Sequence, residues 1–248
     1  MPRLIPFRLV AACALAFILV LCSAALAVAK GTPADLRVLA GQKVLADQTL
    51  RTGTTAVPTS RRASCFGSAS VGSGKNVRIA GATPLGLLAQ AARSNKALQP
   101  LLITDAFSFG LGLCAIGGVE PKGKEAFWQL RIDHKASSVG GDAVKLKPRQ
   151  EALWYLTEAS PGPAELALKA PRAVRPGKAF RVRVLAYDEK GRAKPAAGVK
   201  VSGAASRTDA RGYAAVTLRR PVRLIARDGK SIPSNRAAVC VGGKCPKG

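Results

Sequence analysis

The stretch that most constrains the fold of this chain covers residues 107–133 and reads as two β-strands joined by a loop. It contains the turn signals Gly117-Gly118 and Pro121-Lys122-Gly123, and the aromatic pair Phe127-Trp128 begins its second strand. Its one cysteine, Cys114, lies where a long-range disulfide could form. The stretch contains no set of catalytic side chains, so it predicts a framework for the fold and not an active site.

Residues 1–29 have the features of a secretory signal peptide. Arg3 and Arg8 give a basic start, residues 9–21 form an apolar run, and small residues suited to cleavage follow. The apolar run is shorter than the roughly 20 residues that a membrane span needs. We therefore expect cleavage between Ala27 and Ala29, a secreted or extracellular chain that can associate with the cell surface, and no transmembrane span after cleavage.

Export changes what the six cysteines can do, because Cys13 and Cys22 leave with the signal peptide. Four cysteines in an oxidising compartment predict two disulfides, with three possible pairings. The most local pairing joins the first two of the mature chain and the last two. We expect no metal, because the cysteines are far apart and the one histidine is distant from them. The four cysteines are Cys65, Cys114, Cys240 and Cys245.

The chain is strongly basic, with 39 lysines and arginines against 14 acidic residues and a formal net charge of +25. Both halves share this excess. For an exported chain we expect no nucleic-acid partner. The anionic partners outside the cytosol are cell-wall polymers, membrane-surface polymers and phospholipid head groups. A basic surface that is only solvated is the alternative interpretation.

Residues 30–159 have the pattern of an α+β domain in which one helix packs on a sheet, and a β-grasp is its simplest small version. Thr83 is a good N-cap and Pro84 suits the first helical position, so we expect a helix that begins here and ends near Ser94-Asn95. The polar stretch at residues 51–81 reads as turns and loops. The expected strands cover residues 36–40, 43–50, 101–104, 143–147 and 152–156.

Six short motifs follow one another between residues 34 and 157. They are Ala82-Thr83-Pro84-Leu85-Gly86-Leu87-Leu88, Ser108-Phe109-Gly110, Ile116-Gly117-Gly118, Phe127-Trp128-Gln129-Leu130, Val139-Gly140-Gly141-Asp142 and Leu153-Trp154-Tyr155. Their order and spacing resemble the transcobalamin C-terminal-like family of secreted bacterial β-grasp domains. That family usually has an Asn-Gly turn where this chain has Asp133-His134-Lys135, and Gly-Asp where it has Arg149-Gln150. These departures leave the turn geometry open.

After a short linker at residues 160–163, the pattern changes to short strands separated by turn signals, which is typical of a β-sandwich. Strands are expected at residues 165–170, 180–187, 199–202, 213–218, 222–226 and 236–241. The runs Pro195-Ala196-Ala197-Gly198-Val199 and Thr208-Asp209-Ala210-Arg211-Gly212-Tyr213-Ala214 resemble bacterial immunoglobulin-like surface modules. The resemblance implies an immunoglobulin-like sandwich at residues 164–241, and residues 242–248 form a terminal tail.

We expect a protein that is not an enzyme. A hydrolytic site normally needs a nucleophile with a base, and the single histidine, His134, lies in a predicted loop, where we interpret it as solvated. Paired carboxylates are the alternative. The acidic residues between positions 30 and 150 are scattered in sequence: Asp35, Asp47, Asp105, Glu120, Glu125, Asp133 and Asp142.

The sequence therefore favours an exported binding or structural protein of the cell envelope, which engages anionic envelope material or another envelope protein. The alternative, implied by the family resemblance, is capture of a small planar ligand such as a corrinoid, together with a partner chain. Aromatic side chains near the sheet edge could offer a flat apolar face to such a ring. The candidates are Phe107, Phe109, Phe127, Trp128, Trp154 and Tyr155.

Overall fold

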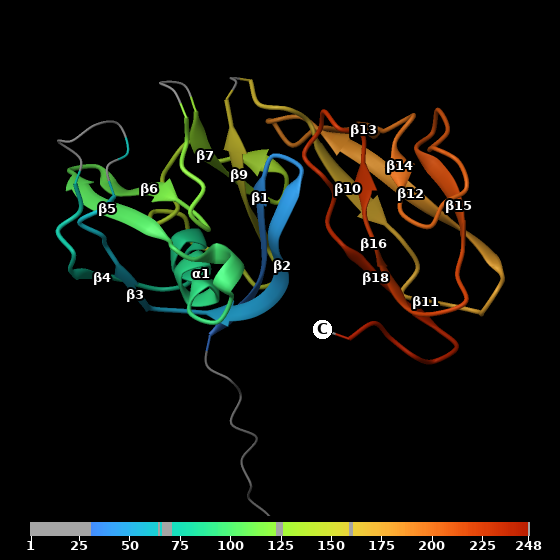
Figure 1. The fold of residues 1–248 in the computed structure, drawn as a ribbon, viewed down its shortest axis with the longest axis horizontal. Helices are drawn as coiled ribbons and strands as arrows, with labels where there is room; N and C mark the ends of the chain where they lie inside the picture. Colours follow the sequence, from blue (N-terminus) through green and yellow to red (C-terminus); the bar gives the residue numbers. More distant parts are fainter. Residues whose placement is uncertain (1–30, 64, 66–70, 123–125, 159–160, 248) are drawn as a thin grey trace, which may run out of the picture. The chain divides into compact units, whose positions relative to one another are not determined.

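The computed structural model describes residues 31–63, 65, 71–122, 126–158 and 161–247, and these are mostly β-strand in several sheets with one α-helix (Figure 1). The predicted signal peptide at residues 1–29, its cleavage between Ala27 and Ala29, and residue 160 of the predicted linker lie outside this range. Within the range, no helix is long and apolar enough to cross a membrane.

The elements of the first part of the chain are named here in order. They are β1 (Thr32–Ala40), β2 (Lys43–Thr52), β3 (Thr55–Pro58), β4 (Asn76–Ile79), α1 (Pro84–Ala92), the short 3-10 helix η2 (Lys96–Leu98), β5 (Leu102–Phe107), β6 (Gly110–Ala115), β7 (Phe127–Ile132), β8 (Lys135–Ala136) and β9 (Glu151–Thr157).

The main sheet of this part has five strands in the order β2-β1-β9-β7-β8. Strands β1 and β9 run parallel at its centre, and every other neighbouring pair is antiparallel. A parallel pair needs a long crossover between its strands, and here that crossover contains α1. Strand β2 is the edge of the sheet: it pairs with β1 on one side and with no described strand on the other.

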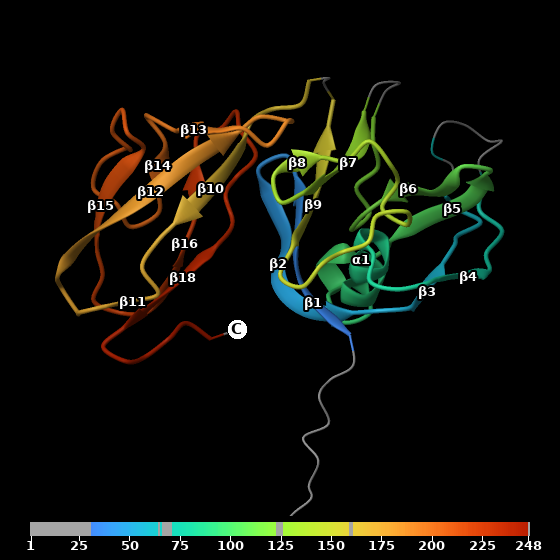
Figure 2. The ribbon, with the colours of Figure 1, turned by 180° about the vertical axis from the view of Figure 1, so that it is seen from behind.

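Helix α1 covers one face of the main sheet, as Figures 1 and 2 show from opposite sides. Thr83 caps it, because its hydroxyl accepts the backbone N–H of Gly86 at 3.1 Å, and Pro84 occupies the first turn. The helix buries Leu85 and Leu88 against Trp154, which faces the helix from β9. This predicted helix is confirmed, although it ends slightly earlier than expected.

Two small ladders flank the sheet. Strand β3 pairs with β4, and β5 pairs with β6, each antiparallel. The β3–β4 ladder lies in the stretch that we expected to be turns and loops, so that expectation was wrong for residues 55–58 and 76–79. Cys65 forms a disulfide with Cys114 of β6 and packs with Ala63, Leu102 and Ala115. It joins the loop before the helix to a strand after it.

The expected strand at residues 143–147 is absent, although these residues belong to the described part of the chain. The segment is extended but has no partner strand. Isolated hydrogen bonds, and not a ladder, hold its backbone. The N–H of Leu146 donates to the carbonyl of Ala82 at 2.9 Å, and the N–H of Lys147 donates to the side chain of Gln150 at 2.8 Å. Leu146 and Val144 reach the core without a ladder.

In the second part of the described chain, all regular secondary-structure elements are β-strands. They are β10 (Glu165–Lys169), β11 (Ala173–Val174), β12 (Ala179–Tyr187), β13 (Ala193–Pro195), β14 (Lys200–Val201), β15 (Tyr213–Thr217), β16 (Val222–Leu224), β17 (Ala226–Arg227) and β18 (Ala237–Val241).

In this part β12 pairs with β10, β13 and β15, and β18 pairs with β11 and β16. Alternate residues of β12, including Val182 and Val184, face a core that they share with Val216 of β15 and Val239 of β18. Each predicted strand has an observed counterpart, but β11 and β13 were not predicted, and the strand expected at residues 222–226 is divided into β16 and β17. A second disulfide, between Cys240 and Cys245, closes a small loop after β18, so both disulfides follow the most local pairing.

Candidate functional site

The face of the main sheet opposite α1 carries polar and charged residues at its centre. Strand β1 alternates, so that Leu36 and Val38 face the helix while Asp35 and Arg37 face the other way. A charged row of this kind is normally solvated, yet Arg37 is only 1 % exposed. Residues after the predicted linker cover it.

Five ionisable side chains meet on this face, and we call them the Arg37 cluster. They are Arg37, Arg131, His134, Glu151 and Glu165. Four come from the main sheet and its β7–β8 turn, and Glu165 is the first residue of β10.

Arg37 is the centre of the cluster. Its guanidinium donates to Glu151 at 2.8 Å and to Glu165, and it also donates to the carbonyl oxygen of Pro233 at 2.9 Å. These partners lie on three segments that are far apart in the sequence. Because a buried charge is stable only when it is paired and hydrogen-bonded, Arg37 ties these three segments together.

Glu165 is fully buried and has three basic neighbours. Besides Arg37, it bonds to Nδ1 of His134 at 2.7 Å and lies 3.8 Å from a guanidinium nitrogen of Arg131. Arg131 also donates to the carbonyl oxygen of Pro163 at 2.9 Å, so it contacts the end of the predicted linker. The carboxylate of this one residue of β10 therefore contacts three basic side chains of the main sheet and its β7–β8 turn.

His134 occupies a strained turn. Asp133 and His134 have φ values of 47° and 74°, which is the left-handed region that a two-residue hairpin turn of type I′ requires at both central positions. The Asp133 carboxylate supports the turn by accepting the backbone N–H of Glu151 at 2.9 Å. The chain thus forms the turn without the Asn-Gly pair that this turn type favours.

The interpretation of His134 as a solvated loop residue was wrong. Its side chain is 26 % exposed, it stacks on the ring of Tyr187 with 3.9 Å between centroids, and it bonds to buried Glu165. The turn geometry holds the imidazole in this position, because φ > 0 directs the side chain across the face of the sheet.

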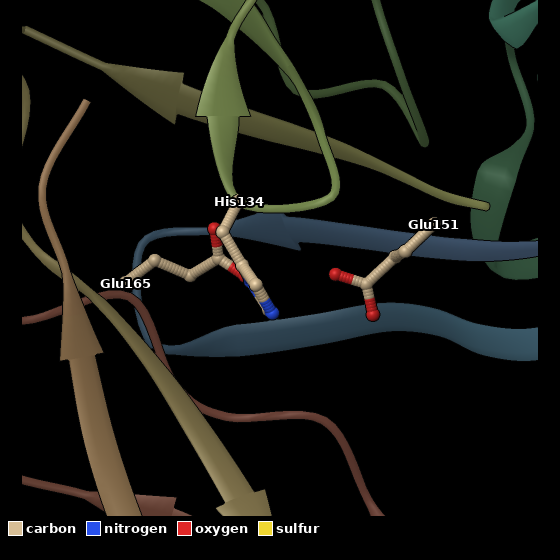
Figure 3. A group of neighbouring side chains, drawn as sticks. All are labelled: His134, Glu151 and Glu165. Carbon is tan, nitrogen blue, oxygen red and sulfur yellow. The ribbon is translucent and has the colours of Figure 1, made fainter. Parts of the chain in front are cut away.

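His134, Glu151 and Glu165 point toward one another, and one donor atom of each lies within 4.8 Å of the others (Figure 3). This donor set could hold a divalent cation only if Arg37 left, since its guanidinium already bridges both carboxylates. With both arginines present, the cluster has no excess of negative charge. The geometry is that of a buried ion-pair network.

The pKa shifts follow from burial and from the arginines. Burial alone would lower the pKa of Arg37, but Glu151 and Glu165 outweigh it and raise that pKa above its ordinary value. Burial would raise the pKa of Glu165, yet Arg37, His134 and Arg131 together hold it below its ordinary value. For Glu151 burial prevails, and its pKa is raised. Arg37 and Glu165 therefore form the persistent charged pair.

A cleft of ≈ 1040 Å³ opens beside the cluster, and His134 and Glu151 are part of its lining. Residues 45–49 of the edge strand β2 form one wall. The other wall comes from β10, β16 and β18. The cleft is therefore bordered by the exposed edge of one sheet and by strands of the second part of the chain.

The six aromatic residues proposed as a ligand face lie in three different places. The structure brings Phe107 and Phe109 together as a stacked pair with 4.9 Å between centroids, and Phe109 is 83 % exposed. Trp128 and Trp154 are core residues beneath α1. The third pair, Phe127 and Tyr155, is half-buried on the opposite face of the sheet. Of these six residues, Phe109 alone has most of its ring in solvent.

Sequence reasoning missed the residues that make the Arg37 cluster. Glu165 reads as the first residue of an ordinary strand, and Arg37 as one polar position of an alternating strand. The one available signal was the Asp133-His134 pair, because these residues stand at turn positions where a glycine would be less strained. Such a replacement indicates that the side chain has a contact to make.

Comparisons with protein-family models, with curated proteins and with solved structures found no match to this chain. The function is therefore argued from geometry and charge.

Proposed function

We propose that this chain is an exported, non-catalytic binding protein of the cell envelope that engages anionic polymers through a basic surface. In this proposal residues 30–159 form a β-grasp domain and residues 164–241 an immunoglobulin-like module. A mixed sheet with one helix on one face supports the first assignment. Short antiparallel strands around a separate apolar core support the second.

The observation that carries the proposal is how few of the basic side chains are neutralised within the molecule. In the described part of the chain, only four arginines lie within 4.0 Å of a carboxylate: Arg37, Arg131, Arg181 and Arg192. The first two are buried. The formal net charge of +25, which becomes +23 when Arg3 and Arg8 leave with the predicted signal peptide, is therefore carried mostly by basic side chains that can contact an external polyanion.

The outward face of β12 and its neighbours concentrates this charge. Arg181 lies over the ring of Tyr213 at 4.0 Å, and Arg183 approaches the same ring at 5.3 Å. Lys169 of β10 is the direct neighbour of Arg183 across the ladder. The two arginines at the Tyr213 ring, with Lys169 beside Arg183 on the next strand, form a surface that we call the Tyr213 face. Guanidinium groups held flat on a ring bind carboxylate or phosphate with less loss of side-chain entropy.

Binding to polyanions tests the proposal. The mature chain is passed over immobilised poly-L-glutamate and polyphosphate, with dextran as the uncharged control, at about 20 mM and about 500 mM salt. We expect retention on both polyanions at low salt and release at high salt. Salt shortens the Debye screening length, which falls to about 3 Å near 1 M, and so weakens the attraction between the chain and the polyanion. Absence of retention at low salt, or retention that salt does not change, would contradict the proposal.

A matched pair of variants tests the surface. Arg181→Gln/Arg183→Gln removes two positive charges from the Tyr213 face, and Lys43→Gln/Lys96→Gln removes two from exposed positions in the first part of the chain. We expect the first variant to elute at clearly lower salt than the second. Elution of both variants at the same salt concentration would be compatible with charge-driven binding but would show that the Tyr213 face is not the binding surface.

The exposed ring of Phe109, stacked on half-buried Phe107, favours a second candidate function, capture of a planar ligand such as a corrinoid. Phe109 projects from the β5–β6 hairpin with most of its ring in solvent. Equilibrium dialysis against cyanocobalamin, with wild type and Phe109→Ala compared, tests this candidate. Binding that Phe109→Ala weakens supports it, and no binding at about 100 μM ligand contradicts it for the isolated chain.

A further inference from the structure

The cleft beside the Arg37 cluster has walls of opposite charge. Asp35 and Asp47 lie on the wall formed by β1 and β2. Lys169, Arg223 and Arg236 lie on the wall formed by β10, β16 and the approach to β18. In a chain with a large positive net charge, two carboxylates at one side of a cleft are a local reversal of sign.

These charges face each other without pairing. Across the residues that the structure describes, none of the five forms an ion pair within 4.0 Å. The Asp47 carboxylate accepts the backbone N–H of Arg236 at 2.6 Å, and Arg223 donates to the carbonyl oxygen of Lys247 at 3.2 Å. The guanidinium groups of Arg37, Arg236 and Arg223 are near enough to favour the charged form of Asp47, but none of them is in ion-pair contact with it. Among the described residues, Lys169 and the Arg236 guanidinium have no carboxylate within 4.0 Å.

The cleft also runs along the outer edge of β2, which pairs with no described strand. Five consecutive residues of β2, positions 45–49, line it, and β2 is the edge of the main sheet. An edge strand presents backbone N–H and C=O groups that an extended peptide can pair with. The walls therefore supply two kinds of recognition, a backbone ladder along β2 and charges of both signs beside it.

From this arrangement we propose that the cleft binds a short, extended, zwitterionic peptide, which pairs with the edge of β2. Its ammonium group lies at Asp35 and Asp47, and its carboxylate lies at Lys169 and Arg236. A neutral ligand would leave both sets of charges uncompensated. A purely anionic ligand would be repelled by the carboxylates. The volume of ≈ 1040 Å³ suffices for three to five residues, each of which extends the chain by about 3.3–3.6 Å.

The partial burial of Asp47 strengthens the argument. Burial raises the pKa of this carboxyl and outweighs the opposing effect of Arg236, Arg37 and Arg223, so its charge is poorly stabilised within the protein. An ammonium group beside it would stabilise that charge, so Asp47 gains more from a cationic partner than an exposed carboxylate would.

Calorimetric titration of the full mature chain with the pentapeptide Ala-Val-Thr-Val-Ala tests the proposal. Four forms of the peptide are compared: free ends, N-acetylated, C-amidated, and blocked at both ends. We expect the free form to bind and each single block to weaken binding by about tenfold. No binding of the free form at about 1 mM would overturn the proposal. Tightest binding by the acetylated, net-negative form would also overturn it, because that order indicates attraction to the basic surface alone.

Two variants locate the charged ends. Asp47→Asn should weaken the free peptide but have little effect on the acetylated one, and Lys169→Gln should weaken the free peptide but have little effect on the amidated one. Asp209→Asn and Lys178→Gln, at exposed sites away from the cleft lining, are the controls and should change nothing. If a variant lost the same affinity for every peptide form, the assignment of the charged ends would be overturned. The comparison of the four peptide forms on the wild-type protein decides the proposal even where a variant folds poorly.

Discussion

Glu165 determines how much the Arg37 cluster contributes to stability, because its carboxylate is the one group that contacts Arg37, Arg131 and His134. It is fully buried and carries a charge on which two buried arginines depend. Loss of one partner from such a network leaves the others uncompensated, which is more costly than loss of the whole network.

We therefore expect Glu165→Gln to lower the free energy of unfolding by about 3 kcal/mol or more, since it leaves Arg37 and Arg131 short of one negative charge in a buried site. Urea unfolding measures this. Asp209→Asn is the matched control, because it removes a carboxylate from a solvent-exposed pair with Arg181 and should lower the free energy of unfolding far less. If the two variants lost similar amounts of unfolding free energy, the charge of Glu165 would not be essential to the stability of the Arg37 cluster.

The same residue gives a pH dependence of defined sign. The pKa of Glu165 is lowered in the folded state by Arg37, His134 and Arg131, despite its burial. A carboxyl of this kind stabilises the fold above its unfolded pKa, ordinarily 4.5, and the stabilisation is lost as the pH falls through the lowered value. Glu151 acts in the opposite sense, because its pKa is raised by burial.

Wild type should therefore lose stability more steeply than Glu165→Gln as the pH falls below about 4.5, and the two unfolding free energies should converge. Urea unfolding at a series of pH values between neutral and acidic gives both curves. Parallel curves at all pH values would mean that the pKa of Glu165 is the same in the folded and unfolded states.

The β7–β8 turn is the element that brings the histidine to the cluster. A non-glycine residue at φ of 74° costs of order 1–2 kcal/mol, so the contacts to Glu165 and Tyr187 must offset that strain. His134→Ala loses the contacts and keeps the strain, whereas His134→Gly loses the contacts and removes it. We expect His134→Ala to be less stable than His134→Gly by about 1 kcal/mol in thermal or urea unfolding. If the alanine variant were as stable as the glycine variant, the turn would have to adopt another conformation.

The elements that local chemistry defines could be predicted from the sequence. The N-cap Thr83 with Pro84 marks the beginning of the helix, and alternating apolar residues mark most strands, since neither signal depends on distant residues. The segment at residues 143–147 alternates in the same way but has no partner strand, and pairing is a property of the tertiary fold. The Arg37 cluster depends on Glu165 meeting β1 across 128 positions of sequence, which no local pattern encodes.

At the scale of the whole molecule, the chain must remain folded while carrying a net charge of +25, whose self-repulsion opposes compactness. Two features act against that repulsion. Each apolar core is closed by strands distant in sequence, and each part of the described chain contains a disulfide. The disulfides act through the unfolded state, where the repulsion would otherwise favour expansion.

The two disulfides should contribute unequally, because a cross-link restricts the unfolded chain more when it closes a longer loop. Cys65 and Cys114 are separated by 49 positions, and Cys240 and Cys245 by 5, which corresponds to about 4 and about 2 kcal/mol in the chain-entropy treatment. Cys65→Ala/Cys114→Ala should therefore lower the free energy of unfolding about twice as much as Cys240→Ala/Cys245→Ala in urea titrations of the oxidised protein. Equal losses would indicate that native packing around the sulfurs, and not loop closure, determines their contribution. Raising the salt concentration should stabilise all three proteins, because it weakens the repulsion among their positive charges.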